Sequence, residues 1–432
     1  MRKRTIDVDM EKVIGILLAG GKGERLMPLT SERTKPSVPI GGTNRIIDFA
    51  LTNYVRSGIR KIQVMTQYKS DSLSRHINSV WPISRDNIFD HYLELIPPQG
   101  KIEGIDVYQG TADAVYQNLK HIMQEKPTNV TIFSADHIYV MNIKPMLHEH
   151  IENNADLTIC TQPRKKSECP INSKGNIDLG VLVADESGRV TKFLEKPNPS
   201  EVEGENIFVS MGNYIFKPKS LEDNLSSERR DFGKDVIPHM IQNKSKVYMY
   251  DFSKNIVPGM NEEYEKNLWY DLGTIDQYYE ASMMLTSTIP KINLYNKEWN
   301  LPIPQASKTV HSDGIRDNIQ KYKELRIGGA FDSLISPGSI ISGGIVLNSI
   351  LSPGARIHSY SEVIDSVLFD DVDVARYAKV KKSIIDKNVK IPEGVEIGYN
   401  KELDLERGFT ISPGGITVVP KDYDFSKYNI KN

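Results

Sequence analysis

The stretch Val13-Ile-Gly-Ile-Leu-Leu-Ala-Gly-Gly-Lys-Gly-Glu-Arg-Leu-Met-Pro-Leu-Thr-Ser-Glu-Arg-Thr-Lys-Pro36 decides the fold of this chain. Its apolar run at 13–19 predicts a buried strand, because a short Ile/Leu-rich run that ends at a glycine pair is typical of strands rather than helices. Gly20, Gly21 and Gly23 then predict a loop that turns tightly and directs several backbone N–H groups at one anion.

Four cationic residues lie in and behind this glycine loop, namely Lys22, Arg25, Arg33 and Lys35. A glycine-rich loop that leaves a buried strand and carries several cations indicates a polyphosphate site. The alternative is a strand, a turn and a solvated charged face.

Two familiar phosphate loops do not match this stretch. A P-loop requires Gly-x-x-x-x-Gly-Lys-Ser/Thr, which the residues from Gly20 to Arg25 do not supply. A Rossmann fingerprint would begin at Gly21 and Gly23, but Leu26 stands where the third glycine is required.

Length and composition fit a chain of two domains. The chain has 432 residues, and its 54 Lys+Arg against 56 Asp+Glu give a net charge of −2, which does not mark a nucleic-acid-binding or membrane-surface protein. Cys160 and Cys169 cannot form a disulfide framework and read as two thiols in a reducing cytoplasm. The basic start at 1–4 is not followed by an apolar run, and no run reaches the roughly 20 apolar residues of a membrane span.

Helices and strands are predicted to alternate after the glycine loop. Residues 45–55 and 71–80 have helical apolar spacing, and 61–66 reads as the strand between them. This alternation predicts an α/β domain with a mainly parallel, Rossmann-like sheet covered on both faces.

Two aspartates are candidate metal ligands. Asp136 follows the predicted strand 130–133, and in open α/β sheets ligands bind at the carboxyl ends of strands. Asp271 stands just before a turn and a helix. Mg²⁺ usually takes one or two carboxylates together with substrate phosphate oxygens, so the pair predicts a Mg²⁺ site.

Further candidates stand at predicted element ends. Thr111, after Gly110, is placed as the N-cap of a helix that runs to about residue 123. The strands 179–184 and 190–194 predict a hairpin, after which Lys196 can hold a phosphate as a point charge and Glu195 can accept hydrogen bonds from sugar hydroxyls. The alternative for Glu195 and Lys196 is an exposed charge pair at a sheet edge.

A repeat begins near residue 329. Ser333-Leu-Ile, Ser349-Ile-Leu, Ser366-Val-Leu and Ser383-Ile-Ile recur every 16 or 17 residues. Short β-branched strands with turn residues at a fixed period predict a left-handed parallel β-helix, with a strand-rich sandwich as the alternative. The predicted domains are therefore an α/β domain at 1–287, a connecting segment at 288–328 and a β-helix domain at 329–432.

Strings along nearly the whole chain resemble the glucose-1-phosphate adenylyltransferases, the family that makes ADP-glucose for bacterial glycogen and plant starch synthesis. Besides the glycine loop, the matching strings are Arg45-Ile-Ile-Asp-Phe-Ala-Leu-Thr-Asn, Thr66-Gln-Tyr-Lys-Ser, Tyr108-Gln-Gly-Thr-Ala-Asp-Ala-Val, Asp136-His-Ile-Tyr, Phe193-Leu-Glu-Lys-Pro, Ser210-Met-Gly, Asp231-Phe-Gly-Lys-Asp and Ile391-Pro-Glu-Gly.

The resemblance implies transfer of the adenylyl group of ATP to glucose 1-phosphate, giving ADP-glucose and pyrophosphate, by a cytoplasmic, Mg²⁺-dependent homotetramer with small-molecule effectors. It implies that 1–287 is the nucleotidyltransferase catalytic domain and that 329–432 serves oligomerisation and regulation. It implies that Arg25 and the glycine loop hold the nucleotide phosphates, that Lys35 helps pyrophosphate leave, and that Asp136 and Asp271 bind Mg²⁺. It assigns Lys196 to the glucose phosphate and, as further substrate-binding positions, Tyr108, Gly180, Glu195, Ser210, Tyr214, Asp231 and Trp269.

The chain departs from the family pattern at its regulatory positions. Glu32 lies where bacterial members often carry a regulatory lysine, and its carboxylate would repel a sugar-bisphosphate activator. Arg45 and Lys421 match effector positions. Leu179 and Val107 replace a frequent Phe and Trp beside the substrate pocket. Two alternatives stay open: a catalytically silent regulatory subunit of a mixed oligomer, and an enzyme for another nucleotide or sugar.

Overall fold

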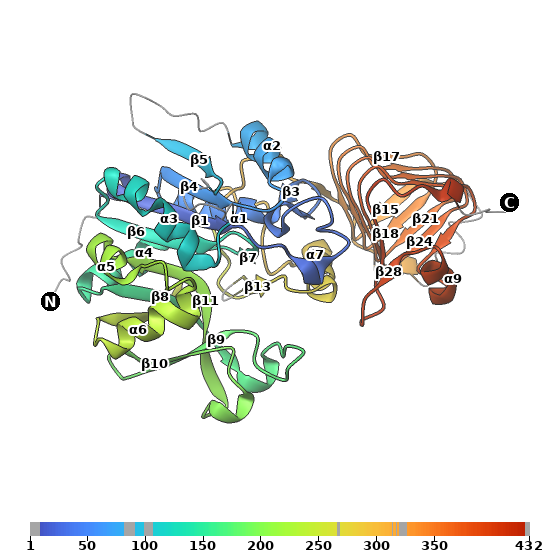
Figure 1. Ribbon diagram of the computed structural model, residues 1–432. Helices are drawn as coiled ribbons and strands as arrows, with labels where there is room; N and C mark the ends of the chain where they lie inside the picture. The colour runs from blue at the N-terminus through green and yellow to red at the C-terminus, as the bar shows by residue number, and fades with distance from the viewer. Residues whose placement is uncertain are drawn as a thin grey trace.

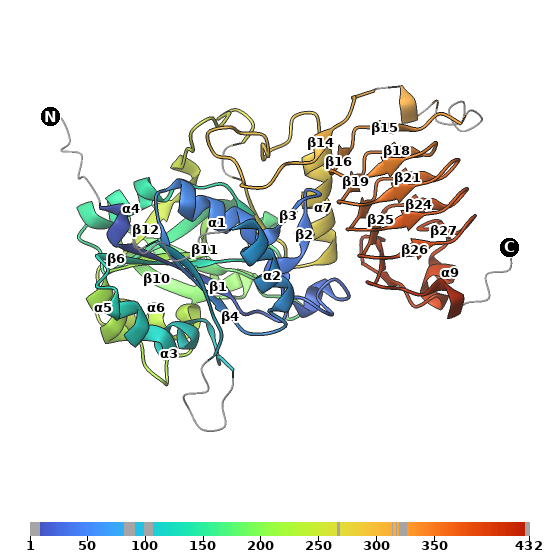
Figure 2. The same cartoon turned by 90° about the horizontal axis from the view of Figure 1, so that it is seen from above.

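A computed structural model of the chain describes residues 9–81, 91–98, 107–265, 268–312, 314–316, 318 and 326–427. The basic start at 1–4 lies outside these residues. An α/β part and a stack of short strands lie side by side (Figures 1 and 2).

The α/β part is built on a nine-stranded sheet of order β10-β9-β11-β6-β1-β4-β5, in which β8 also pairs with β11 and β12 pairs with β8. The pairs formed by β1 with β4 and β6, and by β4 with β5, are parallel, whereas β11 runs antiparallel to β6, β8 and β9. The nine strands are β1 (Val13–Ala19), β4 (Lys61–Thr66), β5 (Tyr92–Ile96), β6 (Asn129–Ser134), β8 (Leu157–Lys165), β9 (Gly180–Ala184), β10 (Val190–Glu195), β11 (Asn206–Phe216) and β12 (Val247–Asp251).

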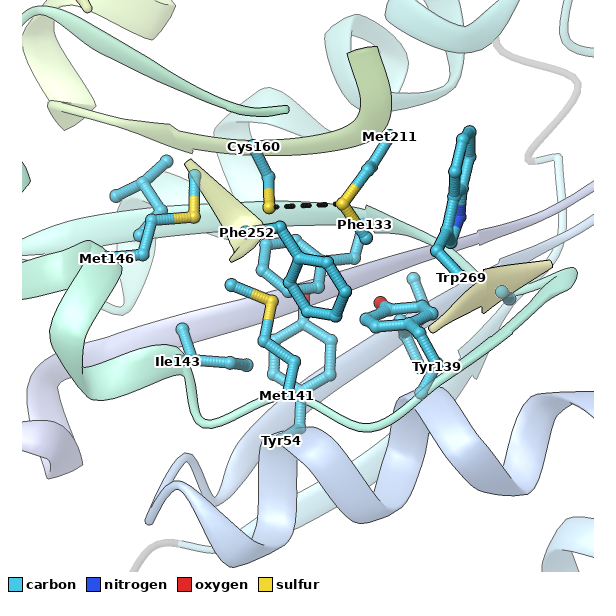
Figure 3. Close-up of a cluster of buried hydrophobic side chains, with 14 of the residues drawn as sticks. Tyr54, Phe133, Tyr139, Met141, Ile143, Met146, Cys160, Met211, Phe252 and Trp269 are labelled. Atoms are coloured by element: carbon cyan, nitrogen blue, oxygen red, sulfur yellow. Dashed lines mark hydrogen bonds between the residues drawn. The ribbon is translucent and has the colours of Figure 1, made fainter. Parts of the chain in front are cut away.

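Helices cover both faces of this sheet because successive side chains of β1 point to opposite sides. Val13 and Leu17 pack in one apolar cluster with α1, α2 and α4, and Ile14 and Ile16 pack in another with α3, α5 and α6. Figure 3 shows part of the first cluster, where Tyr54 of α1 lies beside Phe133 of β6. The helices are α1 (Ile46–Arg56), α2 (Asp71–Val80), α3 (Thr111–Gln124), α4 (Ile143–Glu152), α5 (Pro218–Asn224), α6 (Ile237–Gln242), α7 (Ile275–Thr286) and α9 (Lys401–Glu406).

The predicted α/β fold class is confirmed, and the sheet is mixed on the side of β11. Two small ladders complete this part: β2 (Pro39–Ile40) with β3 (Asn44–Arg45), and β7 (His137–Tyr139) with β13 (Trp269–Asp271). The second ladder is important for the site, because it pairs Asp271 with His137, the residue after Asp136.

The N-cap prediction for Thr111 is wrong. Gly110 is the N-cap residue of α3, and no side chain caps that helix. The Thr111 hydroxyl instead donates to Asp231 Oδ2 at 3.1 Å, because the backbone carbonyl of Arg230 already accepts from the first free N–H groups of the helix. The backbone carbonyl of Arg230, in a distant segment, therefore takes the place of the side-chain cap that local rules predicted.

The second part is a parallel β-helix whose coils stack as three sheets (Figures 1 and 2). Its strands pair in steps of 16 or 17 residues, as in Leu334 with Ile350 and Ile350 with Val367. The first sheet contains β14 (Ser307–Lys308), β16 (Leu334–Ile335), β19 (Ile350–Leu351), β22 (Val367–Leu368), β25 (Ser383–Ile385), β29 (Thr417–Val419) and β28 (Thr410–Ile411). The second contains β15 (Gly329–Phe331), β18 (Ile345–Leu347), β21 (Glu362–Ile364), β24 (Lys379–Lys381) and β27 (Glu396–Ile397). The third contains β17 (Ile340–Ile341), β20 (Arg356–Ile357), β23 (Asp373–Val374) and β26 (Lys390–Ile391).

The repeated serines have a structural purpose at one corner of the β-helix. Ser333, Ser349, Ser366 and Ser383 are all buried. The hydroxyls of the first three each accept from the backbone N–H of the serine one coil further on, at 3.0–3.2 Å. This serine ladder satisfies backbone donors that would otherwise be unpaired at the corner.

One apolar cluster joins the two parts of the molecule. Tyr278 and Leu285 of α7 pack with Leu334, Ile350 and Val367 of the β-helix. Figure 2 shows α7 standing between the sheet and the stacked coils. No helix among the described residues has the length and apolar character needed to cross a membrane.

Candidate active site

A cavity of about 790 Å³ opens at the carboxyl ends of β1, β4 and β6. Loops after parallel strands converge there, which is why residues far apart in the sequence share one pocket. Ten of the predicted site residues line it: Gly20, Gly21, Gly23, Arg25, Lys35, Tyr108, Asp136, Glu195, Tyr214 and Asp231.

The other predicted site residues lie outside that lining. Gly180, Ser210, Trp269 and Asp271 are not among the lining residues, although Asp271 contacts the lining residue Lys35, and Lys196 directly follows β10. Arg45 and Lys421 are not at the pocket but at the junction with the β-helix, where Arg45 pairs with Asp370 at 3.2 Å and Lys421 with Glu32 at 2.6 Å.

The glycine loop owes its shape to Gly23. This residue has φ +63°, and an added Cβ would meet the Thr30 side chain at 3.0 Å. The Thr30 hydroxyl also donates to the Gly23 carbonyl at 2.8 Å, which holds the turn in place. At Gly21, by contrast, an added Cβ would meet nothing within 4 Å, so the loop backbone faces open space there.

Two carboxylates and one ammonium form the centre of the pocket floor. Lys35 Nζ lies 3.0 Å from Asp136 Oδ2 and 3.0 Å from Asp271 Oδ1, although Asp136 follows β6 and Asp271 ends β13. Burial by itself would lower the pKa of Lys35, but the two carboxylates raise it above its ordinary value. Burial by itself would raise the pKa of both aspartates, but Lys35 and the His137 ring lower both. All three groups are therefore charged at neutral pH.

His137 also belongs to this centre, and the sequence reading did not single it out. Trp269 Nε1 donates to His137 Nδ1 at 3.2 Å, which leaves Nε2 as the other ring nitrogen, 3.4 Å from Asp136 and 3.5 Å from Asp271. The residue stands in the motif Asp136-His-Ile-Tyr, so its position beside the first carboxylate was the available signal. Trp269, buried behind it, orients the ring.

The two carboxylates fit a hard divalent cation. Asp136 and Asp271 each direct an oxygen at the same point, now taken by the Lys35 ammonium, and both are ionised. Among the described residues there is no cluster of three or more His, Cys, Asp or Glu side chains arranged to hold a metal ion. Such a two-carboxylate set suits a cation that takes its remaining ligands from water and substrate oxygens, as Mg²⁺ does.

Glu195 lies at the other end of the pocket between two glycines. An added Cβ at Gly233 would stand 2.4 Å from its Oε2, so this position must lack a side chain for the carboxylate to fit. At Gly180 an added Cβ would stand 3.2 Å from the same oxygen, which is a tight contact. Burial and the nearby Asp231 carboxylate raise the pKa of Glu195. Tyr214, which packs on Phe232 with 5.4 Å between ring centroids, closes the wall beside it.

Asp231 is positioned by a short turn of π-helix at Phe232–Val236. Its Oδ1 accepts from the backbone N–H groups of Gly233 and Lys234, and its Oδ2 accepts from Thr111. A carboxylate held from both sides in this way presents a fixed hydrogen-bond acceptor to the pocket.

Arg25 and Lys196 meet at Asp178, a residue that the sequence reading did not consider. Arg25 Nη1 donates to Asp178 Oδ2 at 2.5 Å and Lys196 Nζ donates to Asp178 Oδ1 at 2.9 Å. Asp178 lies directly before Leu179 and β9, with no motif around it, so no pattern in the sequence pointed to it.

Two family models match the chain. A nucleotidyl transferase model matches residues 14–288, and a model of the GlmU-like C-terminal hexapeptide matches residues 318–419. Families of the first kind generally use a divalent metal ion.

Curated relatives match nearly the full length. Proteins named glucose-1-phosphate adenylyltransferase from Thermus thermophilus and Deinococcus radiodurans are 45% and 43% identical to this chain, and each alignment covers 96% of this chain and 99% of the relative. The protein of the same name from Bifidobacterium longum is 42% identical, over 95% of this chain and 98% of its own length.

Proposed function

The chain belongs to the glucose-1-phosphate adenylyltransferase family of nucleotidyl transferases, and from this premise we propose how its pocket carries out the reaction. The enzyme transfers the adenylyl group of ATP to glucose 1-phosphate, giving ADP-glucose and pyrophosphate for glycogen synthesis.

A phosphate oxygen of glucose 1-phosphate attacks the α-phosphorus of ATP in line, the bond from that phosphorus to the bridging oxygen breaks, and pyrophosphate leaves. No covalent intermediate with the protein is required. The protein therefore acts by positioning two anionic substrates and by neutralising the charge that develops on the leaving group.

The observation that carries this proposal is the ionised centre Lys35–Asp136–Asp271 beneath the glycine loop. In our proposal the loop of Gly20, Gly21 and Gly23, together with Arg25, binds the phosphates of ATP. Lys35, now held by two carboxylates, donates to the pyrophosphate that leaves.

We assign the divalent site to Asp136 and Asp271, with Mg²⁺ as the ion. When bound, the ion would neutralise phosphate charge between the two substrates. His137, held by Trp269, keeps a ring nitrogen beside both carboxylates and so fixes their orientation.

We assign the sugar half of the pocket to the end of β10 and the walls around it. Lys196 holds the phosphate of glucose 1-phosphate, and the fixed acceptors Glu195 and Asp231 suit the hydroxyl groups of glucose. The remaining substrate positions in this proposal are Tyr108, Gly180, Ser210, Tyr214 and Trp269.

For regulation, we propose a cytoplasmic homotetramer whose effectors bind near Arg45 and Lys421. Lys421 is paired with Glu32, so an anionic effector at this place has to compete with a carboxylate. This pairing supports the expectation that a sugar bisphosphate is a poor activator of this enzyme. A screen of anionic metabolites against the purified enzyme tests it, and strong activation by a sugar bisphosphate would contradict it.

The experiment that tests the function is turnover of the purified chain with glucose 1-phosphate and each nucleoside triphosphate. We expect ADP-glucose and pyrophosphate with ATP as the preferred nucleotide. A wide preference for UTP or dTTP would assign the enzyme to another nucleotide, and a folded protein that forms no ADP-glucose with any effector would identify a silent subunit.

A further inference from the structure

Asp178 connects the two halves of the pocket. Each of its carboxylate oxygens accepts from a different cation: Oδ2 from Arg25, behind the glycine loop, and Oδ1 from Lys196, after β10. The Asp178 side chain is only 8% exposed, whereas those of Arg25 and Lys196 are 57% and 46% exposed. One buried carboxylate therefore holds two side chains that otherwise extend into solvent.

The backbone around Asp178 fixes this arrangement. Gly180 pairs with Glu195 in the β9–β10 ladder, which brings the residues before β9 beside those after β10. The N–H of Ile177 donates to the carbonyl of Pro197 at 2.9 Å. Lys196 has φ +50°, a conformation that non-glycine residues adopt rarely and mostly where the fold constrains them.

The charge of Asp178 is maintained by its partners. Burial alone would raise its pKa, but the hydrogen bonds from Lys196 and Arg25 lower it below the ordinary value. The carboxylate is thus ionised at neutral pH, and its negative charge lies within hydrogen-bonding distance of both cations.

This inference rests on the proposed function, in which Arg25 and Lys196 bind phosphates. The phosphates of both substrates then need hydrogen bonds from Arg25 and Lys196, which already donate to Asp178. We propose that Asp178 is a positioning residue that pairs Arg25 with Lys196 in the free enzyme and competes with the phosphates of ATP, glucose 1-phosphate and pyrophosphate for these two cations.

On this proposal, a substitution of Asp178 lowers the KM values of the substrates instead of raising them. Asp178→Asn keeps the size of the side chain and one hydrogen-bond acceptor but removes the competing charge. We expect KM to fall about threefold to fivefold for both ATP and glucose 1-phosphate, the size expected for partly exposed ion pairs, and pyrophosphate to bind more tightly by a similar factor. Damage to the structure alone would raise KM.

The matched control is Asp185→Asn, which removes the same charge from the turn of the same β9–β10 hairpin. The Asp185 carboxylate accepts there from Ser187 and from the backbone N–H of Arg189. Steady-state kinetics give the KM values, and calorimetric titration with pyrophosphate gives the affinity without turnover. Unchanged or raised KM values in Asp178→Asn, or the same decrease in Asp185→Asn, would overturn the proposal.

A second variant keeps the test decisive if Asp178→Asn does not fold. Lys196→Gln releases Asp178 to pair with Arg25 alone, so we expect KM for ATP to rise about twofold or more, in addition to a rise in KM for glucose 1-phosphate. An unchanged KM for ATP would contradict the role of Asp178. An unchanged KM for glucose 1-phosphate, or a wild-type enzyme without turnover, would instead contradict the proposed function.

Discussion

At the scale of single residues, the pocket floor depends on the balance between burial and charge. Asp136 is mostly buried, with a side chain 28% exposed, and it stays ionised because Lys35 lies 3.0 Å away. Its other oxygen accepts from the Ser134 hydroxyl, so both oxygens are held. A carboxylate fixed in this way keeps its orientation when a cation replaces the Lys35 ammonium, and such preorganisation is the condition for strong electrostatic catalysis.

Removing the charge of Asp136 should therefore affect the chemical step. We expect Asp136→Asn to lower kcat by about two orders of magnitude or more, because a positioned electrostatic group is lost while the shape of the pocket stays the same. Steady-state rates at saturating substrates and increasing Mg²⁺ measure it, with Asp185→Asn as a charge-matched control. Near-normal turnover would exclude Asp136 from the metal site.

His150 gives a prediction about pH. It lies buried in α4, its Nδ1 bonds with the Thr158 hydroxyl at 2.8 Å, and within the described part of the chain its Nε2 has no hydrogen-bond partner. Burial lowers the pKa of His150 to about 4 from 6.5. Between pH 6.5 and 4 the His150 ring is protonated in the unfolded chain but stays neutral in the folded protein. Folding stability therefore falls as the pH falls through this window, and this group does not affect it at higher pH.

We expect the free energy of unfolding of the wild type to fall by up to about 3 kcal/mol more than that of His150→Gln between pH 6.5 and 4. Urea unfolding at a series of pH values measures the difference. His148→Gln, on the same helix, is the control and should follow the wild type. Parallel acid profiles for wild type and His150→Gln would show that His150 does not stay neutral in the folded protein.

The sequence predicted those site residues whose place is set by a local pattern. Asp136 follows a buried run, and such a run ends where ligands bind in an α/β sheet, so its position could be inferred without any contact. Asp178 could not be found in this way. It is defined by bonds to Arg25, 153 residues away, and to Lys196 across a hairpin, and neither bond leaves a local pattern in the sequence.

At the scale of elements, the β-helix was predictable because its repeat is itself a structural unit. Each coil places a serine at the same corner, and the residue before each serine, Asp332, Asn348, Asp365 or Lys382, has a positive φ. The helix start at Thr111 was not predictable by the same means, because the Arg230 carbonyl that accepts from the first N–H groups of α3 comes from a segment far away in the sequence.

The serine ladder gives a prediction for this element. Ser366 donates to the Ile364 carbonyl at 2.7 Å and accepts from the Ser383 N–H at 3.2 Å. We expect Ser366→Ala to lower the free energy of unfolding by about 1–3 kcal/mol, because it leaves a buried backbone N–H without its acceptor. The shift of the urea midpoint measures it. The exposed Ser187→Ala is the control, and equal shifts in the two variants would contradict the role of the ladder.

At the scale of the whole molecule, α7 connects the pocket with the β-helix. The helix begins at Ile275, shortly after Asp271, and Asp276 in its first turn accepts from the Ser412 hydroxyl at 2.5 Å. Further along, the Tyr279 hydroxyl donates to the Asp365 carbonyl at 2.7 Å. Any displacement of the coils against the sheet therefore acts on the helix that follows Asp271, the carboxylate that we propose as a metal ligand.

The two parts are also joined by a buried ion pair. Arg33, on the segment behind the glycine loop, donates to both carboxylate oxygens of Asp386 in the β-helix, at 3.1 and 2.8 Å. The side chains are 3% and 1% exposed. Two charges taken out of water in this way depend on each other, so that the loss of one leaves an uncompensated buried charge.

We therefore expect Arg33→Met to cost about 3–5 kcal/mol of unfolding free energy, and the double variant Arg33→Met/Asp386→Asn to cost less than Arg33→Met alone. Asparagine is chosen because Asp386 Oδ1 also accepts from the N–H of Lys387, and an amide oxygen can keep that bond. A double-mutant cycle from urea unfolding gives the coupling. Additive costs would mean that the two charges do not stabilise each other, and the apolar cluster around Tyr278 and Leu285 would then be what holds the β-helix to the sheet.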